Sequence, residues 1–338
     1  MKRALITGVT GQDGAFLASQ LLDSGYEVLG TVRRGGNPKS GRLDTLGLTG
    51  KIKLIPLEIT DLSNVLSIMS EFKPDLVFNL AAQSFVQDSF IHPTLTTQIN
   101  YFGVLNFLES IRLLKLKSRF FQASSSEIYG NSLSTIQNED SPLKPVSPYA
   151  ISKCAAHLLV GSYREAYGIH ASSGILFNHE SELRGREFVT RKISSQLAEI
   201  AMGRTEPIEL GNLDARRDWG YAKDYTQAIK LIIESDHADD YVIASNATNS
   251  VREFFTACAV YAGFQPYFDG EGLDEKCFDS SSGRLLCRVN TNFFRPLDIT
   301  CPRGDSSKMF DTFGWKPTTG LKKIAEIMTD FDLRLLKN

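Results

Sequence analysis

Residues 4–14 read Ala-Leu-Ile-Thr-Gly-Val-Thr-Gly-Gln-Asp-Gly, and this stretch decides the fold. A short apolar run leads into three glycines spaced three apart, and apolar residues then recur at helical spacing over residues 16–22. Glycines between a strand and a helix allow a tight turn and close ligand approach, and the helix N-terminus attracts phosphate. The pattern predicts a dinucleotide-binding turn, with contacts from Gly8, Thr10, Gly11, Gln12, Asp13 and Gly14.

The first half of the chain alternates short apolar runs with helical patterns. The further runs are residues 27–32, 52–55, 76–80, 120–124 and 171–177. Strands that alternate with helices form parallel sheets through right-handed crossovers. We therefore expect an α/β fold with a Rossmann-type, doubly wound parallel sheet.

After residue 177 this regularity weakens, and loops rich in Arg, Asn and Gly flank a helical pattern over residues 190–202. A second lobe begins here, and the chain returns to the first lobe near residues 218–244. We expect an NADP-binding Rossmann domain of residues 1–177 plus about 216–245. A smaller, mixed α/β domain of about 178–215 plus 246–338 would bind the substrate.

Bulk composition excludes several classes of protein. The 37 basic and 39 acidic residues nearly cancel, so neither nucleic acid nor a membrane surface is an expected partner. The five cysteines form no Cys-x-x-Cys pair, which argues against a zinc site and a disulfide framework and favours a reducing cytoplasm. No apolar stretch is long enough for a signal peptide or a membrane span. We expect no metal.

The end of the second expected strand indicates the cofactor. An acidic residue there would favour NAD, because it accepts hydrogen bonds from the ribose 2′-hydroxyl. The chain instead has Arg33 and Arg34, which suit the 2′-phosphate of NADP. We expect Asp61 near the adenine and Leu80, Ala81 and Ala82 near the nicotinamide half.

The candidate reacting groups follow two later elements. Tyr149 and Lys153 are four residues apart at the start of an expected helix, so they share one face. A nearby ammonium favours the phenolate, which makes Tyr149 usable as an acid or base. Ser125 and Glu127 follow the strand at residues 120–124, where ligands of parallel sheets collect.

Glu127 adds a second base to this set, and a second base fits dehydration. Oxidation of a sugar at C4 acidifies the C5 proton, which Glu127 could remove before the C6 hydroxyl leaves as water and hydride returns to C6. A simple alcohol dehydrogenase or a C4 epimerase would need only the tyrosine and a hydroxyl.

The chain resembles the GDP-mannose 4,6-dehydratase family over nearly its whole length. The resemblance is carried by the glycine turn, the two arginines, Ser-Ser-Ser-Glu-Ile-Tyr-Gly at 124–130, and Tyr-x-x-x-Lys. More specific still are residues 178–192, 211–225, 251–254 and 294–296. The resemblance implies an NADP-dependent lyase that converts GDP-mannose into GDP-4-keto-6-deoxymannose, with Ser125, Glu127, Tyr149 and Lys153 as its catalytic residues.

The resemblance also assigns binding residues that isolated patterns would not reveal. For the cofactor it adds Leu62, His179 and Arg184 to the contacts named above. For the GDP-sugar it implies Ser84, Asn178, Val189, Lys192, Gly211, Arg217, Arg252 and Arg295. The family forms dimers and tetramers, so a homodimer or homotetramer is the expected assembly.

Three departures from the family pattern leave the sugar open. Ser125 stands where the family usually has Thr, Glu182 replaces a common Pro, and residues 269–290 read as a polar hairpin. GDP-mannoheptose and GDP-N-acetylglucosamine are therefore alternative substrates. A 4-keto sugar reductase or epimerase and an NADP-sensing regulator are the other functions considered; Glu127 argues against the first, and the intact Tyr-Lys pair argues against the second.

Overall fold

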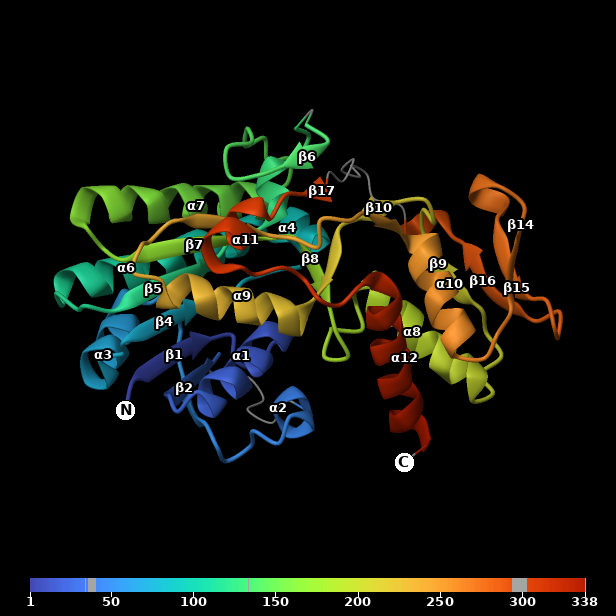
Figure 1. Cartoon of the computed structure of the whole chain (residues 1–338), viewed down its shortest axis with the longest axis horizontal. Coiled ribbons are helices and arrows are strands. Elements are labelled where there is room, and N and C mark those ends of the chain that lie inside the picture. Colours follow the sequence, from blue (N-terminus) through green and yellow to red (C-terminus); the bar gives the residue numbers. More distant parts are fainter. Residues whose placement is uncertain (34, 36–40, 133, 294–302, 338) are drawn as a thin grey trace. The chain divides into compact units, whose positions relative to one another are not determined.

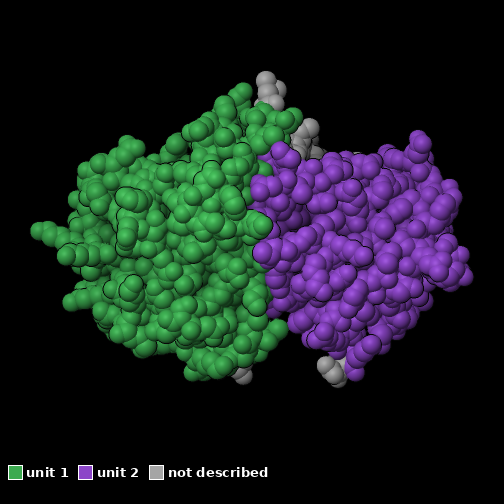
Figure 2. Space-filling view, viewed as in Figure 1, with its two compact units in different colours: residues 1–177, 222–243, 304–316 green, residues 178–221, 244–303, 317–338 purple. Residues whose placement is uncertain are grey.

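The computed structural model describes residues 1–337 except 34, 36–40, 133 and 294–302. It divides into two compact units (Figure 2). Unit 1 comprises residues 1–177, 222–243 and 304–316, and unit 2 comprises residues 178–221, 244–303 and 317–338.

Unit 1 is built on a seven-stranded sheet in the order β12-β7-β5-β4-β1-β2-β3, and every neighbouring pair is parallel. The predicted doubly wound α/β fold is therefore confirmed. The strands are β1 (Arg3–Thr7), β2 (Glu27–Val32), β3 (Lys53–Pro56), β4 (Leu76–Asn79), β5 (Arg119–Ala123), β7 (Ala171–Leu176) and β12 (Asp240–Ile243).

Helices cover both faces of this sheet (Figure 1). α1 (Gln12–Asp23) packs against α9 (Ala222–Glu234), and α6 (Gly103–Leu113) packs against α3 (Leu62–Phe72) and α7 (Pro148–Tyr167). Met69, Phe107 and Val160 bury the second group against Val77 and Phe120 of the sheet. The shorter elements are α2 (Gly41–Thr45), α4 (Val86–Ile91), α5 (Pro93–Thr97), the π-helix η1 (Gln98–Phe102), the 3₁₀ helix η2 (Ser126–Tyr129), β6 (Ile136–Gln137), β17 (Arg303–Gly304) and α11 (Ser307–Phe313).

Residues 304–316 correct the expected domain boundaries, because they belong to unit 1 rather than to the second domain. Met309 and Trp315 are buried there, and the Trp315 indole donates to the carbonyl of Asp224 at 3.3 Å. Lys308 bonds the carboxylate of Asp239 at 2.6 Å. The return of this short segment depends on contacts with residues some 70 to 90 positions earlier, which no local pattern encodes.

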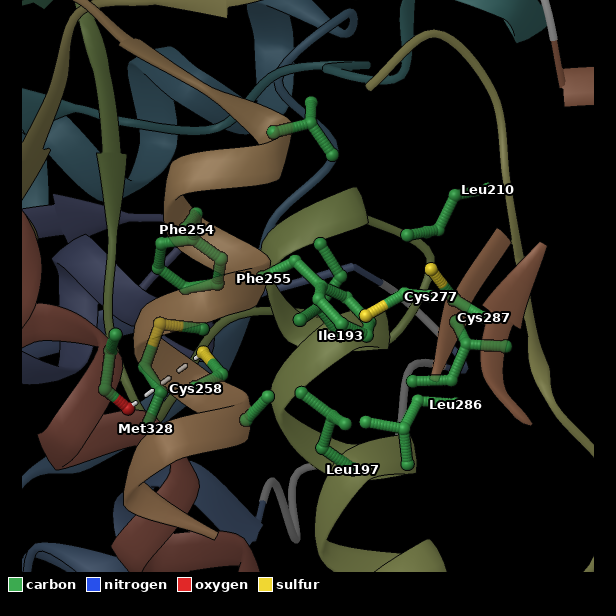
Figure 3. Packing of buried hydrophobic residues seen from close by; sticks show 14 of the residues in the cluster. Ile193, Leu197, Leu210, Phe254, Phe255, Cys258, Cys277, Leu286, Cys287 and Met328 are labelled. Atoms are coloured by element: carbon green, nitrogen blue, oxygen red, sulfur yellow. Dashed lines mark hydrogen bonds between the residues drawn. The ribbon is translucent and has the colours of Figure 1, made fainter. Parts of the chain in front are cut away.

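Unit 2 has a four-stranded sheet in the order β14-β15-β16-β9, with two helices packed against the sheet and a third helix packed on those two. Figure 3 shows Leu197, Phe255 and Leu286 among the side chains that converge on its core. Its elements are β8 (Asn178–Glu180), α8 (Val189–Ala201), β9 (Ile208–Leu210), β10 (Arg216–Arg217), β11 (Trp219–Tyr221), β13 (Asn249–Ser250), α10 (Val251–Tyr261), β14 (Pro266–Asp269), η3 (Gly272–Asp274), β15 (Lys276–Asp279), β16 (Leu285–Val289), η4 (Thr291–Phe293) and α12 (Leu321–Lys337).

The expected hairpin at residues 269–290 is formed by β15 and β16, where Cys277 lies directly opposite Cys287. Both are buried free thiols, as are Cys154 and Cys258. Cys301 lies outside the described residues. Within the described part of the chain, no helix is long and apolar enough to cross a membrane.

Candidate active site

The turn between β1 and α1 is built from glycine because its backbone is closely packed. Gly8 has a φ of +67°, and a Cβ added there would lie 3.0 Å from the amide nitrogen of Ala81. A Cβ on Gly14 would lie 2.4 Å from the carbonyl oxygen of Gly8. Gly11 is the N-cap of α1 and has no side chain to occupy the helix N-terminus. These glycines leave a backbone-lined cradle of the kind that a pyrophosphate needs.

A buried polar network that the sequence analysis missed supports the floor of this turn. The Thr7 hydroxyl donates to Asn79 at 2.7 Å, and the Asn79 amide donates to Gln122 at 2.8 Å. The Thr7 oxygen also accepts from the backbone amides of Leu80 and Ala81 at 3.1 and 3.0 Å. The network therefore links the carboxyl ends of β1, β4 and β5. Its sequence signal is one polar residue near the end of each of three buried strands.

Of the two arginines that are expected to contact the 2′-phosphate of the cofactor, the structure describes only Arg33. Arg33 is exposed at the end of β2, and Arg34 lies outside the described residues. Arg42 of α2, which the sequence analysis did not assign, donates to the carbonyl of Thr10 at 3.2 Å. Asp61 is the N-cap of α3 and accepts from the amide of Ser63 at 2.9 Å. Its carboxylate thus has a capping role beside the start of α3, where Leu62 lies.

Helix α7 carries the expected Tyr-Lys pair and begins at a defined cap. Ser147 caps the helix by accepting from the amide of Ala150 at 3.1 Å, and Pro148 occupies the first turn. Tyr149 and Lys153 are both buried. The Lys153 ammonium donates to the carbonyl of Ala123, the last residue of β5, at 2.8 Å, and lies 6.0 Å from the centroid of the Tyr149 ring. This bond fixes the start of α7 to the end of β5.

Ser125 and Glu127 follow that same end of β5. Ser125 is buried, and its hydroxyl oxygen accepts from the backbone amide of Glu127 at 3.3 Å in the turn that opens η2. η2 contacts α7. The structure therefore brings the ends of β5 and the start of α7 together, and with them the four expected catalytic residues.

Burial lowers the pKa of Lys153 from its ordinary value to about 8, because the ammonium loses hydration. Lys153 is thus an ionisable group whose charge changes near physiological pH. Perturbed groups of this kind are typical of functional sites.

A second residue that the sequence analysis missed is Asn100, which lies buried in the π-helix η1. Its amide accepts from the backbone nitrogen of Gln83 at 2.9 Å and donates to the carbonyl of Gln83 at 3.1 Å. It also donates to Ser152 of α7 at 3.1 Å. Asn100 therefore fixes residues 80–85, which include Ala82 and Ser84, to the helix that carries Tyr149. A π-helix is often found at functional sites, and nothing in the sequence pattern predicts one.

In unit 2, the expected ligand-binding residues begin on β8. Asn178 and His179 pair in parallel with Trp219 and Gly220 of β11, and His179 is buried. Arg184 lies 3.2 Å from the carboxylate of Glu180, and its guanidinium lies 3.5 Å from the centroid of the Phe188 ring.

Lys192 and Val189 lie on α8. The Lys192 ammonium donates to the carbonyl of Glu209 at 2.6 Å and lies 3.6 Å from the centroid of the Phe293 ring. Burial lowers the pKa of Lys192, and the charge of Glu209 opposes that shift. A Cβ on Gly211 would lie 2.6 Å from the carbonyl oxygen of Phe293. Lys192, Gly211 and Phe293 thus belong to one cluster.

Two further arginines that were expected to bind the substrate, Arg217 and Arg252, have partners in the described part of unit 2. Arg217 on β10 donates to the carbonyl of Arg216 at 2.7 Å. Arg252 bonds Asp214 at 2.8 Å and also bonds Glu275. Arg295 lies outside the described residues. The carboxylates of Asp214 and Glu275 therefore offset the positive charge of Arg252, which the sequence did not predict.

Comparison with known proteins supports one family. A family model described as GDP-mannose 4,6 dehydratase matches residues 5–328. The GDP-mannose 4,6-dehydratase of Sinorhizobium fredii (strain HH103) is 43% identical over 343 residues, which cover 99% of this chain and 98% of that protein. The GDP-mannose 4,6 dehydratase of Homo sapiens is 39% identical over 342 residues, covering 99% of this chain and 92% of that protein.

Solved structures share the fold. The dTDP-glucose 4,6-dehydratase of Bacillus anthracis matches with a TM-score of 0.81 at 18% identity, covering 100% of this chain and 97% of that one. A UDP-glucose 4-epimerase from Thermotoga maritima matches with a TM-score of 0.83 at 20% identity, covering 99% of both chains. At identities of 18% and 20%, this likeness shows a shared fold alone.

Proposed function

The chain is a member of the GDP-mannose 4,6-dehydratase family, and from that premise we propose that it converts GDP-mannose into GDP-4-keto-6-deoxymannose. The reaction oxidises C4, removes the C6 hydroxyl as water and leaves no net change in redox state. The observation that carries this proposal is the position of Glu127. It lies in the same turn as Ser125 and beside the helix that bears Tyr149 and Lys153.

The β1–α1 turn fits a nicotinamide dinucleotide, because Gly8 and Gly14 let its backbone pack closely and Gly11 leaves the N-terminus of α1 without a side chain. When bound, the dinucleotide supplies a hydride acceptor for C4 and a hydride donor for C6. The residues that would hold it are the turn, residues 80–82, Tyr149 and Lys153, together with His179 and Arg184.

We infer that the dinucleotide is NADP. Arg33 directly follows β2, where a cation suits a 2′-phosphate, and Arg42 donates to the carbonyl of Thr10 in the turn. Calorimetric titration with NADP and NAD tests this inference: tighter binding of NAD would contradict it.

Tyr149 takes the proton of the C4 hydroxyl as C4 is oxidised, and the Lys153 ammonium favours the phenolate that performs this step. Ser125 donates a hydrogen bond to the oxygen at C4. Glu127 then removes the C5 proton and delivers a proton to the departing C6 hydroxyl, which leaves as water. As hydride returns to C6, C5 receives one proton in place of the one that Glu127 removed. This matches the one proton that Tyr149 accepted from the C4 hydroxyl, so the protons balance.

The GDP moiety is held by residues of unit 2 and by Ser84 in this proposal. Lys192 and Arg217 supply positive charge for the diphosphate, as would Arg295. Asn178, Val189, Gly211 and Arg252 shape the rest of the site, the charge of Arg252 being offset by Asp214 and Glu275. GDP-mannoheptose and GDP-N-acetylglucosamine remain the alternative substrates. Glu182 bears on the choice of sugar, because it places a carboxylate where the family commonly has Pro. That carboxylate accepts a hydrogen bond from the hydroxyl of Tyr221 at 3.2 Å.

We propose that the chain assembles as a homodimer, with a tetramer as a further step. Ile151 and Leu158 are seven residues apart on α7, so they share one face of the helix, and they remain 56% and 59% exposed. A second copy that covers this face would bury these side chains. Sedimentation of a Leu158→Asp variant tests the assignment, and an unchanged oligomer would contradict it.

The cytoplasm is the proposed location of the enzyme. Four buried cysteines, Cys154, Cys258, Cys277 and Cys287, are free thiols in the described part of the chain, and free thiols suit a reducing compartment.

Replacing Glu127 with Gln should lower kcat roughly 10²-fold, because an amide cannot remove the C5 proton. The amide keeps the size of the side chain, so NADP binding should be unchanged in a calorimetric titration. Glu71→Gln, on the exposed surface of α3, serves as the control and should retain full turnover. Full activity of the Glu127→Gln variant would remove Glu127 from the mechanism.

A further inference from the structure

Residues 181–188 form the loop between β8 and α8, and Glu182 anchors it from two sides. Its backbone carbonyl accepts a hydrogen bond from the guanidinium of Arg191 in the first turns of α8. Its carboxylate accepts from the hydroxyl of Tyr221 on β11 at 3.2 Å. The loop is thus attached both to the strand beside it and to the helix that follows it.

Arg191 is in turn fixed by the C-terminal helix. Its Nη2 lies 2.7 Å from a carboxylate oxygen of Asp332 on α12, and the two residues are only 5% and 2% exposed. Ser194 donates to the other Asp332 oxygen at 2.8 Å, and the Arg191 guanidinium lies 5.1 Å from the centroid of the Phe331 ring. The Asp332 carboxylate therefore determines how the guanidinium is oriented.

A planar guanidinium that is held on one side presents its remaining donors in a fixed direction. Arg191 uses Nη2 for Asp332 and Nη1 for the carbonyl of Glu182. A lysine at this position would have a single ammonium on a flexible stem and could not keep both the ion pair with Asp332 and the hydrogen bond to Glu182 in the same geometry. The pair thus transmits the position of α12 to the loop.

The loop contains Arg184, whose guanidinium is itself held by Glu180 at 3.2 Å and by the Phe188 ring at 3.5 Å. Displacement of the loop backbone at Glu182 would move Arg184, two residues later. The same displacement of the loop should move Lys192 less, because Lys192 lies within α8 and donates to the carbonyl of Glu209 on β9.

We propose that Asp332 is a positioning residue that acts through Arg191 to set the place of Arg184, and thereby the affinity for NADP. The proposal rests on the cofactor role of Arg184 that is part of the proposed function. Asp332 touches neither cofactor nor substrate in this account, and its effect reaches them through the loop.

The test compares Asp332→Asn and Arg191→Lys with the wild-type enzyme by calorimetric titration with NADP and, separately, with GDP. The Kd for NADP should rise about tenfold or more, since charge-assisted bonds orient the loop. The Kd for GDP and the kcat at saturating NADP should each stay within about threefold. Asp330→Asn, at a half-buried residue of α12 that pairs with Arg334 on the same helix and not with Arg191, is the matched control and should bind both ligands as the wild type does.

A double variant, Arg191→Met with Asp332→Leu, separates positioning from simple stability. Replacement of a buried ion pair by apolar residues is often neutral or stabilising, so its Tm should recover towards that of the wild type. Its NADP affinity should stay low, because methionine cannot donate to the Glu182 carbonyl. Recovery of NADP affinity together with Tm, or an equal loss of GDP affinity in the single variants, would overturn the proposal.

Wild-type measurements distinguish the two levels of failure. If the wild-type protein binds no NADP, the proposed function fails. If it binds NADP and dehydrates GDP-mannose while the three variants bind NADP as tightly as it does, the positioning role of Asp332 alone fails.

Discussion

Replacing Lys153 with Met should lower kcat roughly 10³-fold and at the same time raise the Tm of the ligand-free protein. Turnover falls because Tyr149 loses the neighbouring ammonium that favours its phenolate. Stability rises because the buried Lys153 ammonium is poorly hydrated, as its pKa of about 8 indicates.

Methionine fits the site because it is unbranched, apolar and of similar length. The carbonyl of Ala123 would lose the Lys153 bond but keep the one from the Gln122 amide at 2.8 Å. No buried acceptor is therefore left without a partner. We expect a gain on the order of 2–3 kcal/mol at neutral pH from removal of the buried charge.

The stability gain should depend on pH in a defined direction. The pKa of Lys153 is lowered from 10.5 in the unfolded chain to about 8 in the folded protein. The cost of the buried ammonium is therefore fully present below about pH 8 and disappears as the pH rises towards 10.5. Calorimetry should show the largest difference in Tm between variant and wild type at pH 7 and a much smaller one near pH 10. A variant that is less stable than the wild type at pH 7 would contradict the account.

Replacing Gly130 with Ala should unfold the segment that follows Glu127. Gly130 has a φ of +50°, and an added Cβ would lie 1.8 Å from the carbonyl oxygen of Lys144. That carbonyl cannot easily move, because the amide of Lys144 donates to Ile128 at 3.0 Å. A backbone clash combined with a left-handed φ should cost about 4 kcal/mol or more and displace the active-site turn.

Gly168 is the matched control for this substitution. It has a φ of +64° as the left-handed C-cap of α7, but a Cβ there would meet nothing within 4 Å. Gly168→Ala should therefore cost only about 1 kcal/mol, the price of the backbone conformation. Denaturant unfolding of both variants measures the difference. Equal stability losses at the two positions would contradict the close contact at Gly130.

The sequence predicted those parts of the molecule that depend on local patterns. Short runs of three to seven residues marked six of the seven strands of the large sheet, because the apolar character of a buried strand can be read from the sequence. The turn that contains Gly8 and Gly14 was also predicted, because a tight turn between a strand and a helix needs glycines where the backbone packs closely.

The features that were missed depend on partners far away in sequence. Asn100 joins Gln83 to Ser152 without any spacing that would mark it. Thr7 and Asn79 each stand at the end of a buried strand, but they are 72 positions apart and no local pattern pairs them. The Arg191–Asp332 pair links residues 141 positions apart. In unit 2, the expected ligand-binding residues came from the resemblance to a family, because single arginines and lysines on loops have no periodicity to reveal their role.

The proposed reaction combines an internal redox cycle with proton removal at C5, and one measurement tests this combination most directly. The purified enzyme is incubated in D₂O with catalytic NADP and, separately, GDP-mannose, GDP-mannoheptose or GDP-N-acetylglucosamine, and the products are analysed by mass spectrometry after return to H₂O. We expect GDP-mannose to lose one water and gain one carbon-bound deuterium at C5, without accumulation of NADPH. Three unchanged substrates, or a product that keeps its water while NADPH is consumed or formed, would contradict the claim.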